Sequence, residues 1–434
     1  MRIVNILRNS IYSLLSFFFL SLMGIYIRKL FNENLPVELL GLEGLFSNII
    51  SILSLAELGI SSVINYSLYK ALAENDEKEI NILMNIYRFM YKIIGVFILG
   101  ISIILFFFLP KIINDTELPW NYIELVYVIQ IITVLSTYFI AYKRTLFVAD
   151  QKDYICIKID TICRCLANIV RIIAIVFYHS YIFYALTALF FNILANIIIS
   201  INVNKKYNFL TYRKVSYSDI CNRNFFKDIK NFMIHKIAYI LYGGADSIII
   251  TAFLGLHTAG LLANYLLIHS GIYSIMYKCF QGIVPTLGNL VYSESEEKKI
   301  KIYNTVDLMY TFLGAYICCI YILFFQKFIS LFFGTQFLLP DGYVWLLAFN
   351  VFLAIQFENA CNYRNTYGSF EKDRLYMIMS AVTKVILSIL FVEKLGVIGL
   401  MMGTIVGLVF IVYGRLMIVF KYIFNKSICK YLIK

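Results

Sequence analysis

The sequence predicts an all-α polytopic membrane protein with about twelve transmembrane helices, arranged as two pseudo-symmetric six-helix bundles around a central cavity. The first observation is composition, because 61% of the 434 residues are apolar and only 15% are charged. Soluble domains are about 45–50% apolar and about 25% charged. The second observation is a series of long apolar runs, and the third is a weak internal repeat. Together they exclude a soluble fold and most cytosolic enzyme classes.

The apolar runs predict the individual spans. A crossing needs about 20 apolar residues, so the chain holds roughly a dozen spans and no large extramembrane domain. The first run follows Arg2 and Arg8, lacks a small-residue cleavage site and is longer than the core of a signal peptide, so we expect it to be retained as a helix. The predicted spans are residues 11–27, 38–66, 86–109, 121–141, 156–177, 181–202, 230–253, 259–291, 304–325, 343–363, 375–392 and 396–420.

Charge sets the expected orientation. Lysines and arginines gather at the N-terminus and in every second loop, which places both termini in the cytoplasm by the positive-inside rule. The net charge of +12 therefore indicates topology and anionic lipid, and not a nucleic-acid partner. The nine cysteines fall in apolar segments or in loops predicted to be cytoplasmic, so we expect no disulfides. Their spacing and the scattered histidines predict no metal site.

A weak repeat divides the chain. Arg144 and Asp153 recur 220 residues later as Arg364 and Asp373, in loops of the same rank. We therefore predict an N-terminal six-helix bundle (1–205), a basic cytoplasmic linker (206–229) and a C-terminal six-helix bundle (230–434). Six is even, so both bundles start from the cytoplasm and the repeat is parallel, as in transporters.

The predicted fifth span contains charges that lipid does not tolerate. Each charge at a helix centre costs about 2.5–3.5 kcal/mol, against about 0.3–0.6 kcal/mol gained per large apolar residue. Asp160, Arg164, Asn168 and Arg171 fall within about 80° of arc and form one polar stripe, with Asp160 and Arg164 spaced to pair. Lys158 lies on the opposite face, where snorkelling to the interface explains it. The stripe indicates either pairing between helices or, as we prefer, a water-filled cavity that binds an anion.

The seventh span carries a second stripe of polar residues. His235, Tyr239, Tyr242 and Asp246 lie within about 60° of one another. A packing contact between bundles is the alternative to a functional role. Lys278, Glu358 and Lys384 are further charges deep in predicted spans.

Excess arginine and lysine on helical stripes favour a phosphate-bearing substrate, because guanidinium groups make paired hydrogen bonds to phosphate oxygens. The chain has no glycine-rich phosphate loop followed by Lys-Ser/Thr, so we expect no nucleotide hydrolysis. We expect neither enzymatic activity nor a cofactor.

Four segments carry a family resemblance. Residues 40–95, with Ala56-Glu57-Leu58-Gly59, resemble the start of bacterial polysaccharide-repeat-unit flippases of the Wzx type, in the multidrug/oligosaccharidyl-lipid/polysaccharide exporter superfamily. Residues 144–154, 235–264 and 396–407 are similar to later parts of the same family. The resemblance covers essentially the whole chain.

The resemblance implies a flippase of the bacterial inner membrane that moves an undecaprenyl-diphosphate-linked oligosaccharide, destined for O-antigen, capsule or exopolysaccharide, to the outer leaflet by alternating access. As further partners we expect membrane lipids, H+ or Na+ as a coupling ion, and a polysaccharide polymerase complex. Family members hold the diphosphate with cationic cavity residues. Topology, without a strict motif match, places here Arg28, Arg164, Arg171, Lys236, Lys278 and Lys384. The candidate ion carriers are Asp160, Asp246 and Glu358.

Three other functions stay open at this point. A multidrug/cation antiporter shares the superfamily fold but is expected to line its cavity with acids. A peptidoglycan lipid II flippase typically has fourteen spans, where this sequence predicts twelve. A membrane-embedded polysaccharide polymerase would usually need a larger loop for its acceptor than this chain offers.

Overall fold

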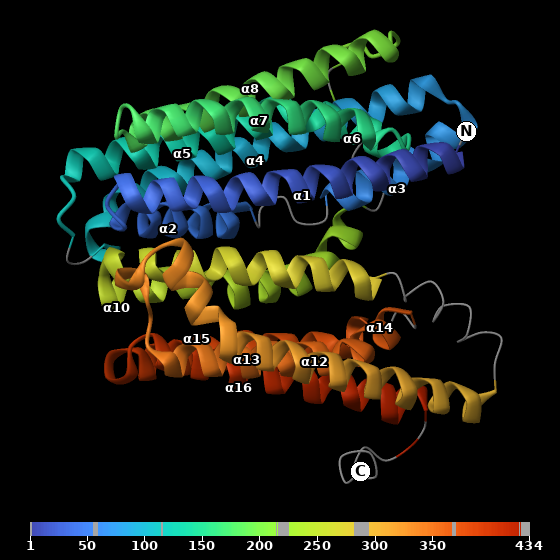
Figure 1. Cartoon of the computed structure of the whole chain (residues 1–434). Coiled ribbons are helices and arrows are strands. Elements are labelled where there is room, and N and C mark those ends of the chain that lie inside the picture. Colours follow the sequence, from blue (N-terminus) through green and yellow to red (C-terminus); the bar gives the residue numbers. More distant parts are fainter. Residues whose placement is uncertain are drawn as a thin grey trace. The chain divides into compact units, whose positions relative to one another are not determined.

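The computed structural model describes residues 2–54, 60–113, 116–213, 215, 225–281, 295–366, 370–424 and 426. Nearly all of these residues are helical (Figure 1). The long helices are α1 (Arg2–Asn34), α2 (Glu38–Leu53), α3 (Ile60–Glu74), α4 (Glu77–Ile112), α5 (Trp120–Ile140), α7 (Asp153–Val176), α8 (Tyr181–Lys206), α10 (Phe225–Gln281), α12 (Glu296–Phe332), α13 (Asp341–Gln356), α15 (Phe370–Leu395) and α16 (Val397–Met417). The short helices are η2 (Ala141–Lys143), α6 (Arg144–Ala149), η3 (Thr335–Phe337), α14 (Glu358–Thr366) and η4 (Ile418–Ile423).

The chain divides into two compact units, Met1–Lys236 and Ile237–Lys434, called unit 1 and unit 2 below. In unit 1, α7 packs between α1 and α8, and α5 contacts α8, α4 and α2. In unit 2, α15 packs along α16, and α13 contacts α12 and α16. Within each unit most of the long helices lie with their axes roughly parallel, and successive helices alternate in direction (Figure 1).

The all-α membrane fold is confirmed. Nine helical segments of the described chain are long and apolar enough to cross a membrane. The described helices account for the twelve predicted spans when three more are counted. These are the charged α7, the pair α2 and α3 taken together, and the second arm of α10. Phenylalanines cover outward faces, with Phe107 on α4 73% exposed and Phe312 on α12 69% exposed, as lipid contact requires.

The long helix α10 contains the turn between the predicted seventh and eighth spans. Gly255 has a φ of 80° and a ψ of 170°, which is not helical. Residues with a side chain avoid this left-handed region, whereas glycine adopts it at little cost. The glycine therefore separates α10 into two arms.

The predicted second span (38–66) was wrong as a single helix. The structure has α2 ending at Leu53 and α3 beginning at Ile60, on either side of residues 55–59, which lie outside the described part. The hydroxyls of Ser51 and Ser54 donate to the carbonyl oxygens of Ser47 and Ile50, at 2.8 and 2.9 Å. Such bonds compete with the helical backbone pattern and favour bends and ends.

Two helices of unit 1 begin at side-chain caps. Before α4, the Asp76 carboxylate accepts a hydrogen bond from the Glu79 amide at 3.0 Å. Before α8, the Ser180 hydroxyl accepts one from the Phe183 amide at 3.3 Å. Each cap satisfies a backbone N–H group that the first helical turn leaves without a partner.

The segment after α8 is hydrogen-bonded to α4. The Asn85 side chain donates to the Thr211 carbonyl oxygen at 2.9 Å, and the amides of Thr211 and Arg213 donate to Asn81 and Asn85 at 3.1 Å each. The first residues of the predicted linker are thereby held against unit 1.

The close packing of α16 on α15 depends on glycine. A Cβ atom at Gly399 would lie 2.3 Å from the carbonyl oxygen of Phe391, a backbone atom that cannot rotate away. We therefore expect Gly399→Ala to destabilise the protein by about 1–3 kcal/mol, as overpacking does. Thermal unfolding in detergent measures the effect. A Cβ atom at Gly100 in α4 meets no heavy atom within 4 Å, so Gly100→Ala should be neutral or slightly stabilising. Equal effects of the two substitutions would contradict the packing argument.

Candidate functional site

Helix α7 presents two different exposed faces. Ile162, Leu166, Ile169 and Ile173 are exposed at helical spacing and form an apolar stripe that suits lipid. Arg164 is also exposed but lies about 160° around the helix from Ile162. Its exposed guanidinium therefore does not belong to the lipid-facing stripe. This placement agrees with the predicted polar stripe.

About two turns further along α7, Arg171 lies beside aromatic rings of unit 1. Its guanidinium carbon is 4.5 Å from the centroid of the Tyr184 ring, a cation–π distance. Tyr184 stacks on Tyr181 with centroids 5.5 Å apart, and Phe31 meets both rings edge-on. This aromatic wall comes from α8 and α1 and fixes the place of the guanidinium.

The predicted cation Arg28 lies near the same wall. Arg28 comes from α1 and Glu43 from α2, and both act electrostatically on the Tyr184 hydroxyl, as Arg171 does. Arg28, Arg171 and Glu43 are thus the charged groups that act on the Tyr184 hydroxyl. Glu43 was not among the predicted site residues.

The two arginines are incompletely paired. Arg28 Nη1 and Arg171 Nε are buried and have no hydrogen-bond partner within the described part of the chain. A buried donor without a partner costs about 1–3 kcal/mol. The charged groups that act on Tyr184 are thus two cations and one anion. An anion with several oxygens could accept hydrogen bonds from such guanidinium groups.

The predicted pairing of Asp160 with Arg164 was wrong. Asp160 forms an ion pair with Arg144, the first residue of α6, and the two side chains are 25% and 33% exposed. The guanidinium of Arg144 reaches α7 because α6 packs against it. Sequence spacing on one helix therefore misidentified the partner.

In unit 2, the predicted cation Lys384 and the predicted carrier Asp246 bind each other. Lys384 Nζ is 2.9 Å from Asp246 Oδ1, and only 2% of the lysine side chain is exposed. Lys384 therefore does not carry an uncompensated charge in this structure. The side chains of the predicted cations Lys236 and Lys278 are outside the described part of the structure.

Glu358, the third predicted carrier, begins α14 in a buried charge cluster. It interacts electrostatically with Arg364 and Arg415. Arg364 Nη1 is 2.5 Å from Asp373 Oδ2, and Arg415 Nε is 3.6 Å from the same oxygen. The cluster therefore combines two cationic side chains with two carboxyl groups.

Sequence reasoning missed several of these partners. The internal repeat had already singled out Arg144, Asp153, Arg364 and Asp373, and the Arg364–Asp373 pair is the contact that this signal could have predicted. Burial raises the pKa of the Asp153 carboxyl above its usual range, and the nearby Arg144 opposes that rise.

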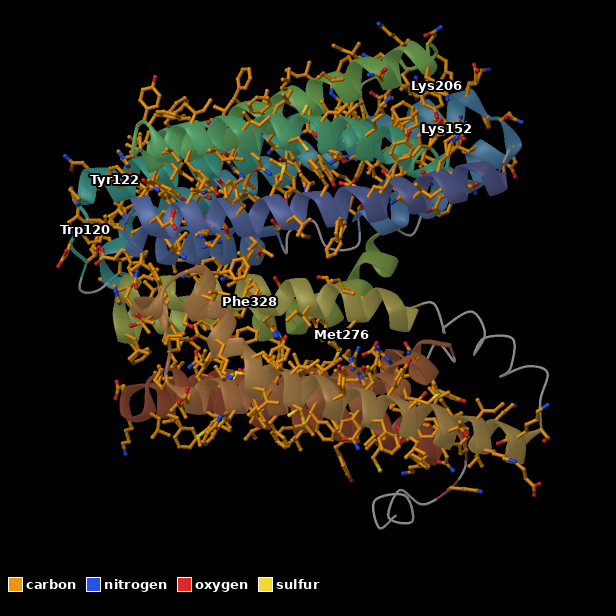
Figure 2. The ribbon with its side chains drawn as sticks, in the orientation of Figure 1. Trp120, Tyr122, Lys152, Lys206, Met276 and Phe328 are labelled. Carbon is orange, nitrogen blue, oxygen red and sulfur yellow. The ribbon has the colours of Figure 1, made fainter. Side chains whose placement is uncertain are left out.

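The ends of unit 1 differ in chemistry. Trp120 and Tyr122 lie at one end, and Lys152 and Lys206 lie at the other (Figure 2). Aromatic residues favour membrane interfaces and lysines favour the cytoplasmic side. The orientation of the chain in the membrane stays a prediction.

The fold is similar to those of solved membrane transporters. The chain resembles the lipid II flippase MurJ in an inward closed conformation, with a TM-score of 0.70, 14% identity, and coverage of 94% of this chain and 87% of that one. It also resembles an inward-facing multidrug resistance MATE family transporter of the MOP superfamily, with a TM-score of 0.68, 16% identity, and coverage of 95% and 96%. The eukaryotic MATE transporter AtDTX14 is similar at a TM-score of 0.57, 12% identity, and coverage of 93% and 94%. At these identities the likeness concerns the fold.

A search of curated protein sequences gives no match. The family model described as "Polysaccharide biosynthesis protein" matches residues 6–291, about two thirds of the chain. The match begins in α1, includes every described helix of unit 1 and extends past α10. This multi-pass membrane protein therefore belongs to the polysaccharide biosynthesis protein family.

Proposed function

We propose that the protein is a flippase that moves undecaprenyl-diphosphate-linked oligosaccharide repeat units from the cytoplasmic to the outer leaflet of a bacterial inner membrane by alternating access. The observation that carries the proposal is that Arg28 and Arg171 of unit 1 each have a buried nitrogen, Nη1 and Nε respectively, without a hydrogen-bond partner in the described part of the chain. Family membership supports a role in polysaccharide assembly.

The placement of the cations on α7 suggests an order of contacts. Arg164 and Arg171 are seven residues apart, which is a rise of about 10 Å along the helix. In the predicted orientation, Arg164 lies nearer the middle of the membrane, and Arg171 and Arg28 lie nearer the outside. We propose that Arg164 contacts the diphosphate first and that Arg171 and Arg28 bind it second. The polyprenyl tail stays in lipid throughout.

The chemistry requires no covalent step. Bidentate hydrogen bonds from guanidinium groups to phosphate oxygens compensate for the loss of hydration. The protein then acts through differential binding in two conformations, which is population shift and not catalysis.

Reconstituted vesicles test the proposal. Purified protein in liposomes with an undecaprenyl-diphosphate-linked oligosaccharide should make the inner-leaflet glycan accessible to an external lectin, and the lipid-linked product should keep its mass. Glycan that stays inaccessible would contradict the flippase function. A longer glycan would indicate a polymerase.

Two substrates separate the proposal from its superfamily alternatives. Vesicles with lipid II in place of the oligosaccharide should show no flipping, since we assign the site to a diphosphate that carries a sugar chain without a peptide. A lipophilic cation should not be exported from a pump-deficient host, because the proposed site in unit 1 uses arginines, which repel cations. Transport of either probe in place of the oligosaccharide would contradict the proposed substrate.

A further inference from the structure

The Lys384–Asp246 pair of unit 2 has the ligands of a cation site. Both carboxylate oxygens of Asp246 lie near Lys384 Nζ, at 2.9 and 3.0 Å. The Lys384 ammonium also donates to the backbone carbonyl oxygen of Tyr242, and it lies 4.4 Å from the centroid of the Tyr242 ring. Every polar partner of the ammonium is an oxygen, and the ring face is a further cation-binding surface. Hard cations take oxygen ligands of this kind.

Three helices close around this ammonium. Lys384 lies on α15, and Asp246 and Tyr242 lie on the first arm of α10. Gly407 of α16 packs against Lys384 and Tyr242. A Cβ atom at Gly407 would lie 3.0 Å from Lys384 Cβ and 3.2 Å from Tyr242 Cε2. The Tyr242 hydroxyl donates to the Thr404 carbonyl oxygen of α16 at 3.0 Å. The ammonium is therefore held in a built pocket and not at a surface.

We infer that Lys384 is a tethered cation that permanently occupies a monovalent-cation site formed by Asp246 and the Tyr242 carbonyl oxygen. An isolated carboxylate in this interior would need a counter-charge to stay ionised. The lysine supplies that charge from within the chain. Asp246 then binds neither a free sodium ion nor a free potassium ion in the intact protein, and unit 2 is independent of cation concentration at this position.

Shortening the lysine should open the site to a ligand from solution. Lys384→Ala removes Cγ, Cδ, Cε and Nζ, which are the heavy atoms of n-propylammonium. We expect millimolar n-propylammonium chloride to raise the unfolding midpoint of the full-length Lys384→Ala protein in detergent by about 5 °C, as specific binding to the folded state does. n-Propanol has the same chain without the charge and should have no such effect. Choline chloride at equal ionic strength controls for salt, and sodium and potassium chloride test inorganic cations.

A second pair of variants keeps the inference testable if Lys384→Ala is poorly produced. Lys384→Met preserves most of the volume and leaves Asp246 without its cation, so its unfolding midpoint should fall by roughly 10 °C. Adding Asp246→Asn to Lys384→Met should restore most of that loss, because no buried charge then remains. The Asp246→Asn/Lys384→Ala protein should not respond to n-propylammonium.

Two results would overturn the inference. One is a Lys384→Ala protein that no cation stabilises beyond the choline control. The other is an Asp246→Asn/Lys384→Met protein that is no more stable than Lys384→Met alone. Unfolding midpoints do not depend on any transported substrate, so these outcomes stay separate from the test of flipping.

Discussion

Replacing Arg171 with methionine should lower the rate of oligosaccharide translocation about 10- to 150-fold without lowering the unfolding midpoint. The rate falls because charge-assisted hydrogen bonds to phosphate, worth about 1.5–3 kcal/mol, are lost. The stability holds because Arg171 Nε is buried and without a hydrogen-bond partner in the described part of unit 1. Removing such a donor relieves an unfavourable burial. Methionine preserves the apolar contact with the Tyr184 ring, so the substitution leaves little empty volume.

Slower translocation at an unchanged unfolding midpoint would identify Arg171 as a binding residue. A residue that only holds the fold together would lose activity and stability in parallel. Lys158→Met provides the matched control, because Lys158 is an exposed cation of the same helix on the lipid-facing side. It should translocate at the wild-type rate. Arg171→Lys keeps the charge but loses the planar donor group, and we expect an intermediate rate. Wild-type translocation by Arg171→Met, at equal protein level in the membrane, would contradict the assignment of the anion site.

The charged side chains of the two units differ in how completely they are paired. In unit 1, one nitrogen each of Arg28 and Arg171 is buried without a partner in the described part, and Arg164 is exposed. In unit 2, the described Lys384 pairs with Asp246, and Arg364 and Arg415 lie beside Asp373. We therefore propose that the cations for an anionic substrate come from unit 1. The sequence predicted one cavity lined by cations from both bundles, and it could not predict this difference.

The fold was predictable because its signals are local. Apolar runs long enough to cross a membrane, with basic residues between them, indicate helices irrespective of their neighbours. Boundaries depended on finer features, such as the hydroxyl-to-carbonyl bonds of Ser51 and Ser54, which accompany the end of α2.

The partners of the charged residues were not predictable in the same way. Ion pairs across helices depend on which helices pack together, and periodicity on one helix contains no such information. Asp160 was assigned to Arg164 four residues away, but it binds Arg144 of α6. Lys384 was assigned to the substrate, but its partner Asp246 lies far away in the sequence. Only the repeat, which aligned Arg144 with Arg364 and Asp153 with Asp373, contained long-range information.

Removing the buried Asp373 carboxylate should have the largest effect on stability. Asp373 has no exposed side-chain surface and accepts from Arg364, whose side chain is 8% exposed. Arg415 lies on its other side. Asp373→Asn would leave these guanidinium groups without their carboxylate, and breaking a buried pair in this way costs about 3–5 kcal/mol. Thermal unfolding in detergent, together with the amount of protein recovered from the membrane, measures the loss.

Unit 1 offers a matched comparison for this prediction. Asp160→Asn breaks the Arg144–Asp160 pair, whose arginine corresponds to Arg364 in the repeat but whose side chains are 25–33% exposed. Water compensates for a partly exposed charge, so we expect a cost of about 1 kcal/mol or less. The double variant Arg364→Met/Asp373→Leu should recover part of the Asp373→Asn loss, because apolar side chains can replace a buried ion pair. Equal losses of unfolding free energy in Asp373→Asn and Asp160→Asn would show that burial does not determine the strength of these ion pairs.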